Sequence, residues 1–121
     1  LSEKATNILY AQAALETGNF KAWYLSETLN LWNRHAGSGR GFWTGRTKYV
    51  SAGDPDLRIF DSVEQCAKDF AQLLSDPLYR HAMVGLRNGD AHEYFRQLER
   101  AGFSATKGYA AALAIRYRGY A

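Results

Sequence analysis

The sequence is poor in cysteine and proline, with one and two respectively among 121 residues, and it contains no long apolar run. A single cysteine excludes an internal disulfide, and Cys66 has no cysteine and histidine cluster around it that would make a zinc site. No stretch reaches the roughly 18 apolar residues that a membrane-spanning helix needs, so membrane insertion is not expected. No basic and then apolar leader segment is recognisable either.

The sequence also lacks a large excess of positive or negative charge. Fifteen Lys and Arg against twelve Asp and Glu leave a formal net charge of +3, and no basic run is long enough for a nucleic-acid-binding arm. We therefore expect no nucleic-acid partner. The small positive charge suits either an ordinary solvated surface or attraction to an anionic polymer.

Several catalytic motifs are missing. The sequence has no H-E-x-x-H, no G-x-S-x-G, no phosphate-binding G-x-x-x-x-G-K-[ST] and no G-x-G-x-x-G, and its three histidines lack metal-ligand spacing. These absences disfavour a zinc hydrolase, a serine hydrolase and a nucleotide-dependent enzyme. No metal and no cofactor are expected.

Aromatic residues are what the sequence has in excess. They make up 14% of the chain, with eight Tyr and three Trp, while the apolar share of 46% and the charged share of 22% are ordinary for a globular protein. The length fits one domain over residues 1–121. Some of these rings must pack in the core, but Tyr and Trp also stack on planar and sugar-like ligands.

The hydrophobic pattern predicts a mostly α fold with one small β-hairpin. A first helix is predicted between Ser2 as N-cap and Gly18 as a left-handed C-terminal residue. A second, less regular helical stretch is predicted over residues 20–35, then a glycine-rich loop at 36–41. Residues 47–50 and 57–60 flank a turn and predict the hairpin.

The second half of the chain carries clear helix signals. Asp61 and Glu64 are interpreted as a capping box that opens a helix with Cys66 on its apolar stripe, which makes Cys66 a core thiol. The pair Asp76 and Pro77 opens another helix. Further helices are predicted from a second capping box at Asp90 and Glu93 to Gly102, and over residues 107–117.

Glu16 is the carboxylate that has no evident structural purpose. It lies seven and eight residues after Leu9 and Ile8, so on a helix it shares their inward face, and it also stands at the helix C-terminus. Burial and the helix dipole both raise the pKa of a carboxylic acid there, towards the range that suits the acid of a glycosidase. The alternative is a structural role, in which Glu16 pairs with Arg46 or Arg116 or bonds a loop.

Two segments around this residue match a known pattern. Residues 14–18 read A-L-E-T-G and residues 29–33 read L-N-L-W-N. They resemble the A-L-E-[ST]-G and N-N-[LA]-F-G motifs of the bacterial N-acetylglucosaminidases of glycoside hydrolase family 73, at the same spacing. Residues 57–62 and 101–109 resemble two later motifs, F-R-x-Y-x-S and A-G-Y-A-T-D-P-x-Y, so the resemblance covers nearly the whole chain.

The resemblance implies a lysozyme-like fold and a hydrolase that cleaves the glycan strands of bacterial peptidoglycan, with the β-1,4 bond after N-acetylglucosamine as the expected target. It assigns the general acid to Glu16. Candidate residues for the wall of a glycan groove are the aromatic side chains Trp32, Phe42, Trp43, Tyr49 and Tyr109, each of which could equally be a core residue. Asn30 could hold the acetamido group or brace its own loop, and we favour the loop.

The chain departs from the family pattern where a second catalytic carboxylate is expected. The family often has glutamate in a hairpin segment T-x-E-Y, and residues 47–49 read T-K-Y here. The remaining candidates are Asp54 and Asp56, which also suit turn chemistry. The substrate's own 2-acetamido group could instead do the nucleophilic work, and this is the interpretation we favour. Asn33 and Leu29 also depart from the motif, where the family has glycine and asparagine.

Three alternatives to an N-acetylglucosaminidase remain open at this point: a muramidase, a lytic transglycosylase, and a weakly active wall-binding or structural domain. In each case the expected partner is the peptidoglycan strand and the expected location is extracellular, periplasmic or virion-associated. A domain of this size and family is also expected to belong to a larger lysin, flagellar or phage-tail assembly.

Overall fold

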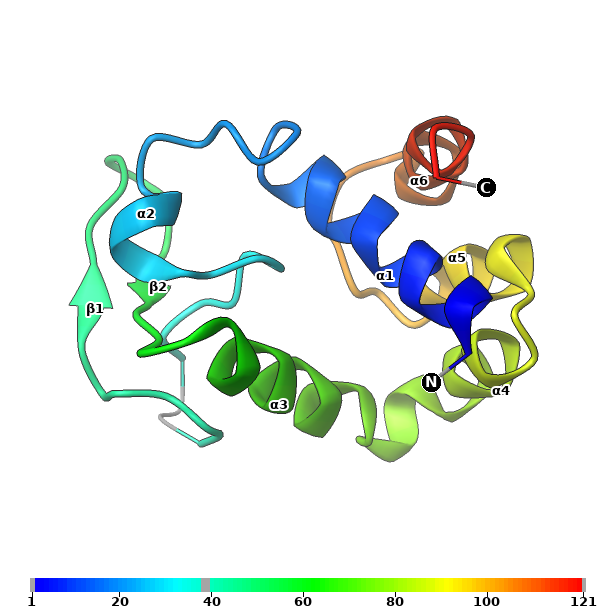
Figure 1. The fold of residues 1–121 in the computed structure, drawn as a ribbon, viewed down its shortest axis with the longest axis horizontal. Helices are drawn as coiled ribbons and strands as arrows, with labels where there is room; N and C mark the ends of the chain where they lie inside the picture. The colour runs from blue at the N-terminus through cyan, green and yellow to red at the C-terminus, as the bar shows by residue number, and fades with distance from the viewer. Residues whose placement is uncertain (1, 38–39, 121) are drawn as a thin grey trace. The chain divides into compact units, whose positions relative to one another are not determined.

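The structure, a computed structural model, describes residues 2–37 and 40–120. Within these residues it is mostly α with one two-stranded hairpin, as predicted (Figure 1). Its elements in chain order are α1 (Glu3–Glu16), α2 (Leu25–Thr28), β1 (Thr47–Lys48), β2 (Leu57–Arg58), α3 (Val63–Leu74), the 3-10 helix η1 (Pro77–Tyr79), α4 (Arg80–Arg87), α5 (Ala91–Arg100) and α6 (Tyr109–Tyr117). No helix in this described part of the chain is long and apolar enough to cross a membrane.

The chain folds into two compact units. The helical unit contains Leu1–Leu15 and Leu74–Ala121, and the hairpin unit contains Glu16–Leu73. The single domain predicted over the whole chain stays a prediction.

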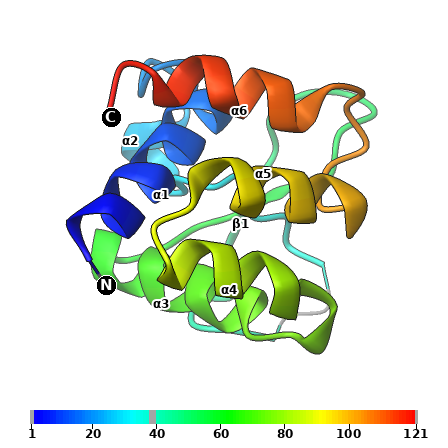
Figure 2. The ribbon, with the colours of Figure 1, turned by 90° about the vertical axis from the view of Figure 1, so that its right-hand side faces the viewer.

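The helical unit has the regular helices that the sequence predicts. Ser2 accepts a hydrogen bond from the Ala5 backbone N–H at 3.1 Å and so caps α1. Figure 2 shows α4, α5 and α6 following one another in this unit. The backbones of α4 and α5 approach so closely that a Cβ on Gly85 would lie 2.8 Å from the backbone nitrogen of Tyr94, which explains why glycine is needed there. Asp90 caps α5 through the Glu93 N–H at 3.2 Å.

A buried glutamine joins three helices of the helical unit. The amide nitrogen of Gln12 in α1 donates to the Tyr109 hydroxyl in α6 at 3.2 Å, and its amide oxygen accepts from the Tyr94 hydroxyl in α5 at 2.7 Å. Gln12 and Tyr94 are fully buried, and burial raises the pKa of Tyr94. A polar side chain in this position is stable because both ends of its amide are bonded.

The hairpin unit has much less regular structure. The helical stretch predicted over residues 20–35 is wrong for most of its length, because only Leu25–Thr28 form a helix. Left-handed backbone at Phe20, Leu29 and Asn33, with φ between 52° and 63°, interrupts the segment. The predicted hairpin is confirmed in shorter form, with Thr47 opposite Arg58 and Lys48 opposite Leu57.

The start of α3 differs by one residue from the prediction. The N-cap is Ser62, whose hydroxyl accepts from the Gln65 N–H at 3.0 Å, while the Gln65 side chain accepts from the Asp61 N–H at 2.6 Å. The helix is therefore capped by Ser62, with Gln65 bonding back to the residue before it, and the assignment of a capping box to Asp61 and Glu64 is wrong. Of the predicted loop at 36–41, residues 38 and 39 lie outside the described part, and the others form no helix or strand.

Candidate active site

Glu16 is the last residue of α1 and is half-buried. Its negative charge acts on a neighbour, Tyr24. The pKa of Tyr24 is raised, first by burial and second by the charge of Glu16. Glu16 is therefore close enough to Tyr24, at the start of α2 in the same unit, for its charge to raise the pKa of the tyrosine.

Half-buried Tyr24 packs against an exposed tryptophan, and neither residue was predicted to be part of the site. Its ring packs edge-on against Trp23, with centroids 5.5 Å apart and an interplanar angle of 73°. Trp23 is 62% exposed, which is unusual for tryptophan. The ammonium group of Lys48 lies 5.4 Å from the centre of the Trp23 ring. The less regular helical stretch predicted over residues 20–35 did not reveal that these two rings pack together at its start.

Lys48, which stands where the family often has a glutamate, is paired with a carboxylate from another element. Its Nζ lies 2.6 Å from Oε2 of Glu27 in α2. The hairpin residue Lys48 therefore has a carboxylate beside it, but this carboxylate belongs to Glu27, 21 positions earlier in the chain. Both side chains are partly exposed, so this pair contributes little to stability.

A cavity of about 240 Å³ lies in the hairpin unit next to Tyr24. Its polar lining residues are Tyr24, Asn33, His35 and Asp54, and its apolar ones are Val50, Pro55 and Leu57. Of the two aspartates considered as a second carboxylate, Asp54 lines this cavity. Its carboxylate accepts a hydrogen bond from the Ser51 hydroxyl.

Asp56 differs from Asp54 although it is only two residues away. It is exposed and is absent from the cavity lining, and its side chain makes no hydrogen bond or ion pair within residues 2–37 and 40–120. Its backbone oxygen accepts from the Ala36 N–H at 2.9 Å. The structure therefore separates two residues that the sequence left equivalent.

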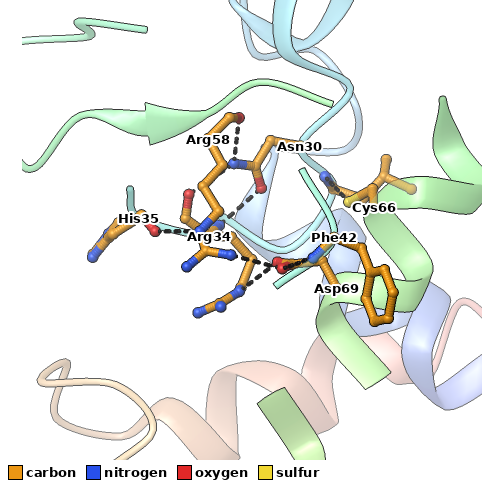
Figure 3. A network of polar contacts seen from close by, with 8 residues as sticks. Asn30, Arg34, His35, Phe42, Arg58, Cys66 and Asp69 are labelled. Carbon is orange, nitrogen blue, oxygen red and sulfur yellow. Dashed lines mark hydrogen bonds and ion pairs between the residues drawn. The ribbon is translucent and has the colours of Figure 1, made fainter. Parts of the chain in front are cut away.

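A buried ionic cluster holds the hairpin unit together (Figure 3). Asp69 in α3 is fully buried, and its two carboxylate oxygens bond Arg34 Nε at 2.8 Å and Arg58 Nη1 at 2.7 Å. The pKa of Arg58 is lowered by burial and by the nearby charge of Arg34, while Asp69 opposes that shift. Arg58 also donates from Nε to the backbone oxygen of His35 at 2.9 Å. We call Arg34, Arg58 and Asp69 the ionic cluster.

Asn30 is bonded entirely to backbone. Its Nδ2 donates to the carbonyl oxygens of Arg34 at 2.8 Å and Arg58 at 3.0 Å, and its Oδ1 accepts from the Arg34 N–H at 2.8 Å. The side chain is 1% exposed. These bonds support the interpretation of Asn30 as a loop brace, while its role as a substrate ligand stays a prediction.

The ionic cluster also positions two of the predicted wall residues. Asp69 Oδ1 accepts from the Phe42 N–H at 3.1 Å, and a Cβ on the preceding Gly41 would lie 2.0 Å from that oxygen, so only glycine fits. Phe42 is half exposed, and the guanidinium of Arg58 lies 4.8 Å from the centre of the Trp43 ring. Both aromatics line a second cavity of about 440 Å³ in the hairpin unit, together with polar residues of α3.

The other predicted wall residues lie in different surroundings. Trp32 is buried and stacks on Phe70, with parallel rings 4.6 Å apart, which makes it chiefly a core residue. Tyr49 is 63% exposed beside Lys48 in sequence. Tyr109 belongs to the helical unit, where it is buried and packs on Phe103. For all three, contact with substrate stays a prediction.

Cys66 is the core thiol that its helix stripe predicts. It is fully buried, and its sulfur accepts from the Leu31 N–H at 3.4 Å (Figure 3). Burial raises the pKa of Cys66 to about 11, which keeps the thiol protonated and unreactive near neutral pH. In the described part of the chain, no group of three or more His, Cys, Asp or Glu side chains could hold a metal ion.

The family profile of glucosaminidases, described as mannosyl-glycoprotein endo-beta-N-acetylglucosaminidase, matches residues 3–121. The chain belongs to this family. It is therefore a glycoside hydrolase, as the resemblance to family 73 implies. No protein of curated function matches the sequence significantly.

Solved structures agree with this assignment. The peptidoglycan hydrolase from Sphingomonas sp. A1 is 30% identical, with a TM-score of 0.71 over 93% of this chain and 74% of that one. A mutant of a peptidoglycan hydrolase from the same organism is 29% identical, with a TM-score of 0.66 over 96% and 84%. The glycoside hydrolase domain of Salmonella typhimurium FlgJ, at 19% identity and a TM-score of 0.61 over 93% and 72%, shares the fold. The mostly α, lysozyme-like fold is thereby confirmed.

Proposed function

We propose that this glycoside hydrolase cleaves the glycan strands of bacterial peptidoglycan, at the β-1,4 bond that follows N-acetylglucosamine. The observation that carries the proposal is the position of Glu16. It is a half-buried glutamate at the end of α1 whose charge reaches Tyr24, and Tyr24 in turn lines a small polar cavity. The family match and the peptidoglycan hydrolase at 30% identity support the choice of substrate.

Glu16 acts as the general acid in this proposal. Cleavage of a glycosidic bond needs a carboxylic acid that gives its proton to the leaving oxygen. Partial burial and a place at the negative end of the helix dipole both favour the protonated form of such a group. Glu16 has both properties, and it occupies the family's A-L-E-[ST]-G motif.

The second catalytic group is the substrate's own 2-acetamido group. The hairpin position that carries a glutamate in many relatives holds Lys48, and this lysine is already paired with Glu27. In substrate-assisted cleavage, the acetamido oxygen attacks the anomeric carbon as the bond to the leaving oxygen breaks, and that oxygen takes the proton of the acid. Water then opens the cyclic intermediate and returns a proton to the acid. The competing proposal, with Asp54 or Asp56 as nucleophile or base, predicts a loss of roughly a hundredfold or more when that aspartate is replaced.

The groove for the glycan strand is lined by exposed aromatic side chains of the hairpin unit. Phe42, Trp43 and Tyr49 are among the predicted residues that are exposed or half-buried, and Trp23 joins them. Rings of this kind stack on sugar faces. Since the proposed substrate is the cell wall, the place of action is extracellular, periplasmic or virion-associated, and the domain acts within a larger lysin, flagellar or phage-tail assembly.

Mass spectrometry of the products of a peptidoglycan digest tests the proposal. An N-acetylglucosaminidase leaves N-acetylglucosamine at the new reducing ends. Reducing-end N-acetylmuramic acid would instead identify a muramidase, and anhydro-muramic ends would identify a lytic transglycosylase. Retention on insoluble walls without any soluble product would identify a binding domain and contradict the proposed activity.

A further inference from the structure

The ionic cluster contains more positive than negative charge. Two guanidinium groups converge on the single carboxylate of Asp69, so one positive charge has no counter-charge within the cluster (Figure 3). The side chain of Arg58 is 2% exposed and that of Arg34 is 19% exposed. Burial lowers the pKa of Arg58 and repulsion by Arg34 lowers it further, although Asp69 opposes the shift. A buried charge of this kind is costly, and a bound anion would neutralise it.

Several nitrogen atoms of the two guanidinium groups are not used by the fold. Arg34 bonds Asp69 through Nε, and its Nη1 and Nη2 make no hydrogen bond within residues 2–37 and 40–120. Arg58 bonds His35 through Nε and Asp69 through Nη1, and its Nη2 makes no hydrogen bond in the same part of the chain. No side-chain nitrogen of the described residues is both buried and unbonded, so these three atoms reach the surface. They form a group of donors without acceptors.

The donors are held in fixed positions before any ligand arrives. The backbone N–H of Arg34 donates to Asn30 Oδ1 at 2.8 Å, and its carbonyl oxygen accepts from Asn30 Nδ2 at 2.8 Å and from the Arg58 N–H at 3.0 Å. Its guanidinium is fixed by Asp69. The Arg58 guanidinium also lies 4.8 Å from the centre of the Trp43 ring. Affinity is gained when binding groups need no reordering, so few contacts are enough to bind a small anion here.

The geometry of the donors favours a carboxylate. The Nη1 and Nη2 atoms of an arginine match the two oxygens of a carboxylate, and this pair is complete in Arg34. Strands of peptidoglycan contain such groups, because N-acetylmuramic acid carries a lactyl carboxyl group and the attached peptides carry others. Chitin has the same β-1,4 backbone without any of them. We propose that Arg34, together with Arg58, binds a carboxylate of the muramic acid units or of their peptides.

This inference rests on the proposed function, because it names a group of the same substrate. It makes Arg34 a residue that selects an acidic strand over an uncharged one. The account of cleavage by Glu16 does not require this selection, so the two can be tested separately.

Binding of three soluble strands tests the site. They are uncharged chitotetraose, the peptide-free tetrasaccharide of alternating N-acetylglucosamine and N-acetylmuramic acid, and the same tetrasaccharide with its peptides attached. Isothermal titration calorimetry would be done on Glu16→Gln, which keeps the strands intact. We expect this parent to bind an acidic strand more tightly than chitotetraose.

Three variants of this parent show whether Arg34 is responsible. Arg34→Gln leaves Asp69 paired with Arg58, so the fold should be retained. It should weaken binding of an acidic strand by roughly ten- to a hundredfold, the usual value of a hydrogen bond to a charged group, and leave chitotetraose binding unchanged. Arg34→Lys keeps the charge without the paired donors and should lose less affinity than Arg34→Gln. Lys21→Gln removes an exposed charge of the same unit and should bind all three strands as the parent does.

The two acidic strands distinguish the source of the carboxylate. A loss in Arg34→Gln with the peptide-free strand identifies the lactyl carboxylate, and a loss with the peptide-bearing strand alone identifies a carboxylate of the peptide. Methyl esterification of that strand tests the contact without changing the protein. The ester should bind to the parent about as weakly as the free acid binds to Arg34→Gln.

Some results would overturn the inference. These are unchanged binding of both acidic strands in Arg34→Gln, an equal loss for chitotetraose, an equal loss in Lys21→Gln, or an ester that binds as tightly as its acid. Such results would leave the proposed activity standing, because that activity is judged by the products of a digest. Conversely, absence of digestion products with a preserved, Arg34-dependent preference for an acidic strand would overturn the activity and leave the carboxylate site.

Discussion

The helical unit and the hairpin unit are stabilised in different ways. The helical unit has regular helices, an apolar core around Tyr94, Phe95 and Leu98, and one buried amide, Gln12. The hairpin unit has a four-residue helix, a two-residue pair of strands and long irregular segments. Its backbone is fixed by side chains, chiefly the ionic cluster and Asn30.

This difference relates to function. A loop that is fixed by specific polar bonds can present side chains at positions that no regular element provides. In the hairpin unit, Phe42 is held by a bond from its backbone to Asp69, and the backbone of His35 is held by a bond from the Arg58 side chain. In the helical unit, regular helices make up most of the structure, and these helices are close to what their sequence predicts.

The largest effect on stability is expected from Asp69→Asn. This change keeps the shape of the side chain but leaves two arginines without their counter-charge, and the side chain of Arg58 is only 2% exposed. Breaking a buried charge network in this way costs about 3–5 kcal/mol. Urea unfolding followed by circular dichroism measures the loss, and a change below about 1 kcal/mol would show that the cluster does not hold the unit.

Cys66 makes it possible to see which unit opens. Because its pKa is raised to about 11, the thiol stays protonated at pH 8 and should react with a thiol reagent only after the hairpin unit opens. Labelling should be accelerated strongly in Asp69→Asn. If a variant of the helical unit accelerated labelling as much for each kcal/mol of unfolding free energy that it loses, the two units would open together, and the contrast between them would not hold.

Gln12→Leu is that variant of the helical unit. It leaves the hydroxyls of Tyr94 and Tyr109 without their bonds to the Gln12 amide, and both tyrosines are buried. The expected cost is about 1–3 kcal/mol for a buried polar group that loses its partner. The matched comparison is Tyr94→Phe, which removes a single donor and should cost less. A stable Gln12→Leu protein would mean that the apolar core alone suffices.

The smallest effect is expected from Glu27→Gln. Its pair with Lys48 is partly exposed, and pairs of this kind contribute about 0.2–1 kcal/mol. Activity should stay within a few-fold of the parent if the acetamido group of the substrate does the nucleophilic work. A loss of roughly a hundredfold, restored by added azide, would instead identify Glu27 as the second catalytic carboxylate.

Much of the helical unit could be predicted because its signals are local. Ser2, Asp76 and Asp90 cap helices as their positions indicate, and Gly102 follows α5 with a left-handed φ of 77°. Each of these features depends on neighbours within a few residues. The spacing of hydrophobic residues and the capping residues were therefore enough to predict where these helices begin and end.

The hairpin unit could not be predicted in the same way, because its structure depends on distant partners. Nothing near Asp69 in the sequence indicates Arg34, 35 positions away, and nothing near Lys48 indicates Glu27. Departures from the family pattern did carry a signal. Leu29 and Asn33 replace an asparagine and a glycine, and both have left-handed backbone, where those two residues are favoured. Reading these positions as turns would have corrected the helix predicted there.

The central claim is that Glu16 is the general acid, and the most direct measurement compares Glu16→Gln with the parent enzyme on purified peptidoglycan. We expect turnover to fall by roughly a hundredfold or more, since a general acid contributes that much. The free energy of unfolding should be unchanged or slightly higher, because a half-buried charge has been removed. A Glu16→Gln protein with turnover close to that of the parent would contradict the assignment.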